Sequence, residues 1–201
     1  MTTLSLTRRA PRGALLSRLS LTGLLSSGMA LSAGPPREPY RRSTETCAIA
    51  DAVLLDQDGR KVRLKPLVES GDPVVVTFFY TSCTTICPVL STGFANLQAR
   101  LGDSPRRIRL ISITIDPARD TPAVLKGYGA RFRAKANWSF LTGTKAEIAR
   151  AMEGFNTFIP DTASMVPINL IYLRRERKWI RIFGVMSASE LLEECRRAGI
   201  Q

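Results

Sequence analysis

Hydrophobic residues in this chain gather into short runs that are separated by polar and amphipathic stretches. Two of these runs, Val74–Tyr80 and Ile108–Ile115, are rich in β-branched and aromatic residues and show little alternation with polar positions. This pattern is typical of strands that are covered on both faces in the middle of an α/β sheet. A helix is expected after each strand, over 88–101 and over 122–132, the second with Thr121 as its N-cap.

Two hairpins are predicted. Runs at 52–55 and 61–64 flank the sequence Asp56-Gln57-Asp58-Gly59. An Asp-Gly turn between two such runs is a hairpin signal. A second pair of short strands, 168–173 and 179–183, is joined by a charged turn near the end of the chain.

Two further helices are marked by possible capping boxes, in which Ser or Thr is followed three positions later by Glu. Thr144 and Glu147 predict a helix that ends around Gly154. Ser187 and Glu190 predict a C-terminal helix.

The order of elements is β-β, then β-α-β-α, an insertion with a short strand at 138–141, and finally β-β-α. Strands that alternate with helices pair in parallel, and the closing hairpin adds antiparallel strands. The sequence therefore predicts an α/β fold, a thioredoxin-like mixed sheet with helices on both faces and an N-terminal β-hairpin. We expect residues 47–201 to form this domain and the stretch 34–46, which contains prolines and arginines, to be a linker.

The first 33 residues have the plan of an export signal. They contain four arginines and no acidic residue, and the mildly apolar run 19–33 ends in small residues. The run is short for a membrane span, which needs about 20 apolar residues. We expect a periplasmic or otherwise exported protein with a cleaved signal peptide, and the alternative is a short anchor that holds it at the inner membrane.

The chain is basic, with a net charge of +12 that falls to +8 without the four arginines of the leader. Its basic residues are spread over several blocks, which is typical of solvated faces. The chain has no recognised nucleic-acid-binding motif, so we do not expect a nucleic acid partner. An acidic membrane or an acidic protein surface suits this charge better.

Two cysteines follow the first buried strand. Pro88 suits the first turn of a helix, so Cys83 and Cys87 stand where a helix begins. Helix N-termini stabilise anions and lower the pKa of a thiol. Four helical steps rise about 6 Å, which is within the Cα separation of a disulfide. The pair could therefore exchange disulfides, hold a soft ion such as Cu(I), or be a plain buried or structural pair.

The other two cysteines, Cys47 and Cys195, lack nearby partners of the kind that zinc needs. They could pair with each other in an oxidising compartment, but the sequence does not give their distance.

The cysteine motif YTSCTTICPVLS, at 80–91, resembles that of the Sco/SenC family of copper chaperones and assembly factors. The resemblance extends from about Ala52 to the C-terminus and includes the segments 112–117, 120–122 and 138–143. It implies a thioredoxin-like fold and a role in assembly of the copper A centre of cytochrome c oxidase. It also implies that the two motif cysteines, Cys83 and Cys87, and a distant histidine bind copper.

This chain has no histidine. The loop that carries the third ligand in Sco-like sequences corresponds here to 161–167, where Met165 is the nearest soft donor. A thioether can hold Cu(I) but suits Cu(II) poorly. Met165 could equally be a core residue, because methionine is a common gap filler. The metal ligands expected are therefore Cys83, Cys87 and, weakly, Met165, with Cu(I) as the copper form.

Val166-Pro167 stands before a strand, a setting similar to that of the cis-proline that holds partner peptides in thioredoxins. Pro167 is therefore a candidate substrate-binding residue, although most X-Pro bonds are trans. Two mechanisms stay open: a metallochaperone that passes Cu(I), and a thiol-disulfide oxidoreductase in which Cys83 attacks and Cys87 resolves. The expected partner is the copper-binding subunit of cytochrome c oxidase or another thiol protein. A thiol peroxidase is a third alternative, but Tyr80 stands where that pattern has proline.

Overall fold

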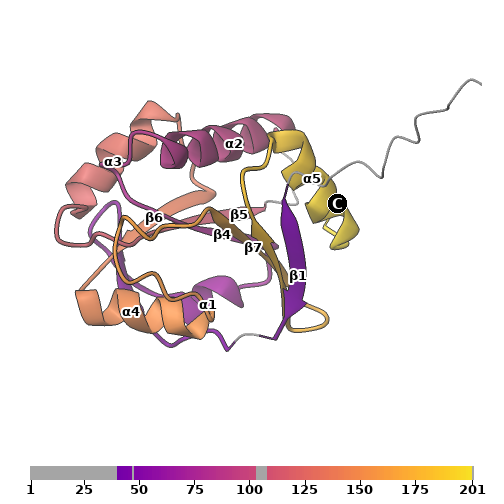
Figure 1. Ribbon diagram of the computed structural model, residues 1–201, viewed down its shortest axis with the longest axis horizontal. Coiled ribbons are helices and arrows are strands. Elements are labelled where there is room, and N and C mark those ends of the chain that lie inside the picture. The colour runs from indigo at the N-terminus through magenta and orange to yellow at the C-terminus, as the bar shows by residue number, and fades with distance from the viewer. Residues whose placement is uncertain (1–39, 47, 103–107, 201) are drawn as a thin grey trace, which may run out of the picture. The chain divides into compact units, whose positions relative to one another are not determined.

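An eight-stranded mixed sheet runs through the protein, in the order β1-β8-β7-β4-β5-β6-β2-β3 (Figure 1). The structure is a computed structural model that describes residues 40–46, 48–102 and 108–200. The expected leader over 1–33 and Cys47 lie outside these residues. The strands are β1 (Arg41–Glu45), β2 (Val53–Asp56), β3 (Lys61–Arg63), β4 (Val74–Phe79), β5 (Arg109–Thr114), β6 (Trp138–Thr142), β7 (Ile168–Leu173) and β8 (Lys178–Phe183). The helices are α1 (Leu64–Val68), α2 (Ile86–Leu101), α3 (Pro122–Arg131), α4 (Lys145–Gly154) and α5 (Ala188–Arg197).

The centre of the sheet is parallel and its flanks are antiparallel. Strand β5 pairs in parallel with both β4 and β6, whereas β7 pairs with β4 in the antiparallel sense and continues into the β7–β8 hairpin. All six residues of β4 are buried, which confirms that its unbroken apolar run marks a strand covered on both faces. The mixed α/β sheet predicted from the sequence is confirmed.

Side chains of β4 alternate between two cores, as the period of a strand requires. Val74, Val76 and Phe78 pack in the core that includes residues of α1 and α4. Val75 and Phe79 pack in the core that includes residues of α2, α3 and α5. Figure 1 shows α2 and α3 above the sheet and α4 below it, so helices cover both faces as expected.

The predicted N-terminal hairpin is present as β2 and β3. Its turn needs the left-handed conformation at Gly59, which has a φ of 78°, and the carboxylate of Asp56 accepts hydrogen bonds from the N–H groups of Asp58 and Arg60. The second strand is one residue shorter than expected, because Leu64 begins the short helix α1, which the sequence did not predict.

The expected linker over 34–46 is wrong in its last residues, because Arg41–Glu45 form the edge strand β1 beside β8. This strand has no fully buried residue, so it lacks the hydrophobic pattern that marks the other strands. Its place depends on distant partners: Arg42 bonds the buried carboxylate of Glu194 at 2.9 Å, and Glu45 approaches Arg181 at 3.3 Å. The folded domain therefore begins before residue 47.

The expected helix caps are mostly confirmed. Thr121 accepts a hydrogen bond from the N–H of Val124 at the start of α3, and Ser187 and Glu190 form a complete capping box at α5. At α4 only half of the box forms. Thr144 accepts from the N–H of Glu147, but the Glu147 carboxylate bonds the N–H of Val53 at 2.7 Å instead of turning back to Thr144.

We predict that Gly154→Ala lowers the free energy of unfolding by about 1–3 kcal/mol, the usual cost of overpacking. A Cβ at this position, the last residue of α4, would lie 2.6 Å from the Cβ of Ala50 and 2.7 Å from its nitrogen. The free energy would be measured by urea denaturation.

Gly127→Ala is the matched control, because a Cβ there, in the middle of α3, meets nothing within 4 Å. This substitution should raise the free energy of unfolding by about 0.5–1 kcal/mol, the helix preference of Ala over Gly. Equal effects of the two substitutions would contradict the close approach at Gly154.

Candidate functional site

Cys83 and Cys87 lie where the chain leaves β4 and enters α2. Both are buried, Cys83 with 6% and Cys87 with 0% of its surface exposed. This edge collects the carboxyl ends of β4, β5 and β6, the place where α/β sheets commonly carry their sites. The strand–cysteine–helix arrangement expected from the sequence is confirmed, with α2 beginning at Ile86.

The sulfur of Cys83 caps helix α2. The first N–H groups of a helix have no partner within the helix, and the N-cap residue Thr85 makes no side-chain cap bond. The Cys83 Sγ accepts a hydrogen bond from the backbone N–H of Cys87 at 3.3 Å and lies 3.8 Å from the Thr85 hydroxyl. Negative charge on this sulfur is therefore stabilised by the positive end of the helix.

The two thiols have opposite pKa shifts. Burial raises the pKa of Cys83, but hydrogen bonds from the backbone and side chain of Cys87 and from Thr85 outweigh burial and lower the pKa from 9.0 to about 6. Burial raises the pKa of Cys87 to about 12, and the neighbouring Cys83 adds to the shift. At neutral pH the pair therefore consists of a thiolate at Cys83 and a thiol at Cys87.

Met165 contacts Cys87 of the pair. Its Sδ lies 3.9 Å from the Sγ of Cys87, although 78 positions separate them in the sequence. The irregular segment 155–167 brings it there, and Arg181 holds the start of this segment through hydrogen bonds to the carbonyl groups of Phe155 and Asn156. The structure thus brings three of the four sequence-predicted site residues together: Cys83, Cys87 and Met165.

Pro167 lies two residues after Met165, and its carbonyl accepts a hydrogen bond from the N–H of Gly184 at 3.0 Å. No cis peptide bond occurs in the described part of the chain, so the Val166–Pro167 bond is trans, unlike the thioredoxin bond that it resembles. The residue is half-buried at the start of β7. Its expected role towards a substrate stays a prediction.

Asp120 is a functional candidate whose placement the sequence did not reveal. It precedes the N-cap of α3, and its carboxylate is fully buried. It accepts hydrogen bonds from the backbone N–H and hydroxyl of Thr81 and from the hydroxyl of Thr114. Asp116, by contrast, lies in the turn after β5 and pairs with Arg119 at 3.4 Å.

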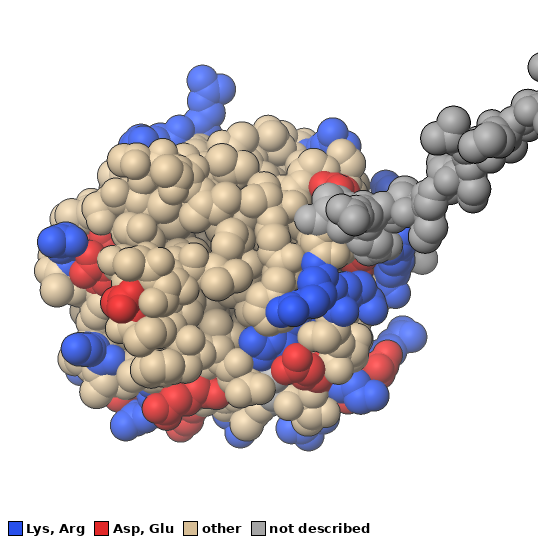
Figure 2. Space-filling view, viewed as in Figure 1, with Lys and Arg blue, Asp and Glu red and all other residues tan. Residues whose placement is uncertain are grey.

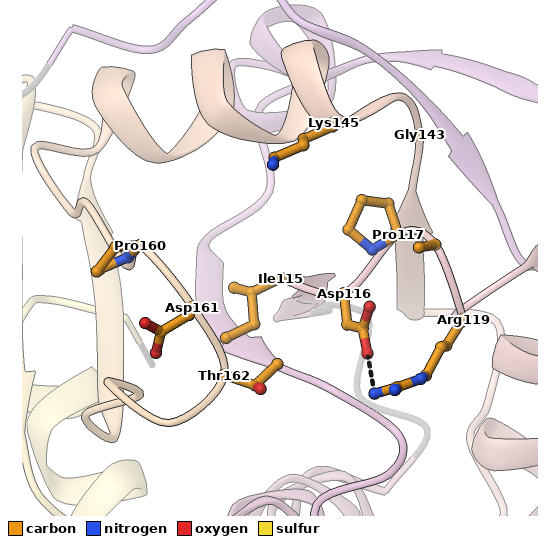
Figure 3. A pocket seen from close by; sticks show the side chains of 10 residues that line it. Ile115, Asp116, Pro117, Arg119, Gly143, Lys145, Pro160, Asp161 and Thr162 are labelled. Atoms are coloured by element: carbon orange, nitrogen blue, oxygen red, sulfur yellow. Dashed lines mark hydrogen bonds and ion pairs between the residues drawn. The ribbon is translucent and has the colours of Figure 1, made fainter.

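A pocket of about 530 Å³ is lined in part by Asp116 and lies at the edge of the sheet where β4, β5 and β6 end (Figure 3). The turn after β5, the start of α4 and the loop at 160–162 frame it, and the Asp116–Arg119 ion pair stands at its side. Neither cysteine is among its lining residues, but the loop that bounds it leads directly to Met165. The pocket therefore adjoins the segment that carries the third sulfur.

Charged side chains lie mostly toward the margins of the face shown in Figure 2, and its central part is uncharged. Exposed apolar side chains adjoin the sulfur residues in sequence: Val89 is 47% and Val166 is 53% exposed. In the described ranges, no group of three or more His, Cys, Asp or Glu side chains is placed to hold a metal. The helices of those ranges are too short or too polar to span a membrane.

Cys195 is a free, buried thiol in α5, and burial raises its pKa to about 12. Cys47, the residue with which it could pair, lies outside the described residues.

We predict that iodoacetamide modifies Cys83 with a rate that rises with pH around a midpoint near 6. The thiolate is the reactive form, and its fraction grows as the pH passes the lowered pKa of Cys83. Cys87 should stay unmodified across this range, because its pKa is raised. Peptide mass spectrometry of the reduced protein at each pH would give both rates.

Cys87→Ser is the control for this experiment, since the substituted residue keeps the backbone N–H that bonds the Cys83 sulfur. The midpoint of Cys83 should stay well below 9 in this variant. A midpoint near 9 in the unaltered protein would contradict the proposed capping of α2 by the sulfur.

Residues 44–174 match the SCO1/SenC family. The chain is 35% identical over 107 residues to the SCO1 protein homolog of Bacillus subtilis, which covers 52% of this chain. The chain spans 54% of that relative's length.

Solved structures have the same fold. BsSco, a member of the Sco family of cytochrome c oxidase assembly proteins, superposes with a TM-score of 0.63 at 24% identity and covers 76% of this chain and 94% of its own. Copper-bound ScoI of Bradyrhizobium japonicum superposes with a TM-score of 0.61 at 26% identity and covers 75% of this chain and 99% of its own. The matched stretch includes the cysteine pair, Asp120 and Met165, and the chain belongs to the SCO1/SenC family.

Proposed function

We propose that this protein is exported and acts through Cys83 and Cys87 in the assembly of the copper A centre of cytochrome c oxidase. The observation that carries the proposal is the paired site itself: a Cys83 sulfur that caps α2 beside a protonated Cys87. A thiolate and a thiol in reach of one another suit both metal transfer and disulfide exchange. Membership of the SCO1/SenC family, and the assembly role ascribed to the family of BsSco, support this setting.

The first mechanism is carriage of Cu(I) as cargo. Thiolate and thioether sulfurs are soft donors that prefer Cu(I). Cys83 and Cys87 would supply the strong ligands, with the Cys87 proton released on binding. Met165, whose sulfur lies 3.9 Å from that of Cys87, would be a weak third donor. The chain has no imidazole to offer, which favours Cu(I) over Cu(II).

The second mechanism is reduction of a partner's disulfide. The Cys83 thiolate would attack one sulfur of the partner, forming a mixed disulfide and releasing the other sulfur as a thiolate. Cys87 would then lose its proton and attack Cys83, which frees the partner as a dithiol and leaves a Cys83–Cys87 disulfide. The low pKa of Cys83 and the high pKa of Cys87 support this assignment of roles.

The partner proposed for both mechanisms is the copper-binding subunit of the oxidase or another protein with exposed thiols. The side chains of Val89 and Val166 are apolar and exposed, and both residues are close in sequence to the sulfur residues. Export rests on the composition of the first 33 residues, with four arginines and a mildly apolar run.

We predict that Cu(I) affinity depends on both cysteines and only modestly on Met165. Loss of a charged thiolate ligand in Cys83→Ser or Cys87→Ser should weaken binding at least about a hundredfold. Met165→Leu, which removes a neutral thioether at nearly constant volume, should weaken it less than about tenfold. Competition with a chromophoric Cu(I) chelator under anaerobic conditions would measure all three.

Met152→Leu is the control, because Met152 is buried on α4 in the opposite core from the cysteines. It should leave the affinity unchanged. A loss for Met165→Leu as large as that for Cys83→Ser would make Met165 a full ligand, and no measurable Cu(I) binding by the reduced protein would overturn the carriage mechanism.

We predict that Cys87→Ser traps a partner through Cys83 as a mixed disulfide, because the resolving thiol is absent. Pro167→Ala in the same background should change the amount of the trapped species, since Pro167 lies in the segment that carries Met165. Non-reducing electrophoresis and mass spectrometry of the exported fraction would detect the adduct.

Cys83→Ser with Cys87→Ser is the control and should trap nothing. If Cys87→Ser gives no mixed disulfide, while copper loading of the oxidase still requires both cysteines, disulfide exchange is wrong and Cu(I) carriage stands.

A further inference from the structure

Asp120 is a buried carboxylate held by neutral donors. None of its surface is exposed. One oxygen accepts from the hydroxyl of Thr81, and the other accepts from the N–H of Thr81 at 3.1 Å and from the hydroxyl of Thr114 at 2.5 Å. In the part of the chain that the structure describes, no ion pair reaches it. Burying a carboxylate is costly unless hydrogen bonds compensate, so these three bonds keep it in place.

These bonds connect the carboxyl ends of two neighbouring strands, β4 and β5. Thr81 follows β4 and stands two residues before Cys83. Thr114 is the last residue of β5 and lies opposite Phe79, the last residue of β4. The hydroxyl of Thr114 also accepts from the N–H of Asp116. The Asp120 carboxylate thus joins the turn before the cysteines to the turn before α3.

The turn that carries Cys83 needs such a support. Its own closing bond, from the N–H of Cys83 to the carbonyl of Tyr80, is long at 3.4 Å and therefore weak. On the helix side, the Cys83 sulfur is held by the N–H of Cys87 at 3.3 Å. On the strand side, Thr81 is held by its two bonds to Asp120.

We propose that Asp120 is the positioning residue of the dithiol. It makes no hydrogen bond to either sulfur, but it holds Thr81 so that the Cys83 sulfur stays against the first turn of α2. The inference rests on the proposed function in taking Cys83 as the reactive thiol. It adds a residue outside the cysteine motif that sets how fast this thiol reacts.

The test is the rate at which iodoacetamide modifies Cys83 in the reduced full-length protein at pH 7. Asp120→Asn and Thr81→Val should each slow this reaction about tenfold, the effect of one lost hydrogen bond to a charged group. Thr114→Val should slow it in the same direction. Thr81→Ser keeps the hydroxyl and should react within about twofold of the unaltered protein.

Ser112→Ala is the matched control. Ser112 is buried on the same face of β5 as Thr114, and its hydroxyl accepts from the indole N–H of Trp138 at 3.0 Å rather than bonding Asp120. This substitution should lower the thermal midpoint of unfolding and leave the reaction rate of Cys83 unchanged. It separates loss of positioning from loss of stability.

The inference is overturned if Asp120→Asn and Thr81→Val fold, as judged by far-UV circular dichroism, and react at the unaltered rate. It is also overturned if Ser112→Ala slows the reaction equally. If Asp120→Asn does not fold, Thr81→Val and Thr81→Ser decide the question between them. The assay contains neither copper nor a partner, so an absence of Cu(I) binding and of mixed disulfides would overturn the proposed function and leave this result standing.

Discussion

The hydrogen bond from the backbone N–H of Cys87 to the sulfur of Cys83 is the interaction on which the site depends. It satisfies a donor that the N-cap residue Thr85 leaves without a side-chain partner, and it stabilises negative charge on a buried sulfur. The same hydrogen bond therefore caps the start of α2 and influences the reactivity of the Cys83 thiol.

The sheet explains why two cysteines four positions apart differ so strongly. Both cysteines pack in the core between α2 and the sheet, but Cys83 meets N–H donors and keeps 6% of its surface exposed, whereas Cys87 is fully buried. The same sulfur chemistry thus lies in two environments, one that stabilises the anion and one that excludes it. These two environments suit an attacking thiolate at Cys83 and a resolving thiol at Cys87. They also suit stepwise loading of a soft metal ion.

The third sulfur depends on contacts far from the motif. Met165 approaches Cys87 because the segment 155–167 has no secondary structure of its own and takes its path from its surroundings. Arg181, buried in β8, bonds two carbonyl groups and the Thr157 hydroxyl at the start of that segment. An arginine with several fixed donors is suited to hold irregular backbone in this way. The proposed Cu(I) role thus rests on sulfur donors alone, although the resemblance to the Sco/SenC family implies a histidine ligand.

The sequence by itself determined the parts that local chemistry specifies. The apolar run at 74–80 and the cysteine motif predicted a buried strand followed by a helix, and the cap residues Thr121 and Ser187 marked two helix starts, because these signals act over a few residues. Only the tertiary structure decided the parts that rely on distant partners. The polar strand Arg41–Glu45 needs β8 beside it, and the burial of Asp120 needs hydroxyl donors from two other segments. The contacts that stabilise these parts come from residues far apart in the chain, so no local pattern in the sequence predicts them.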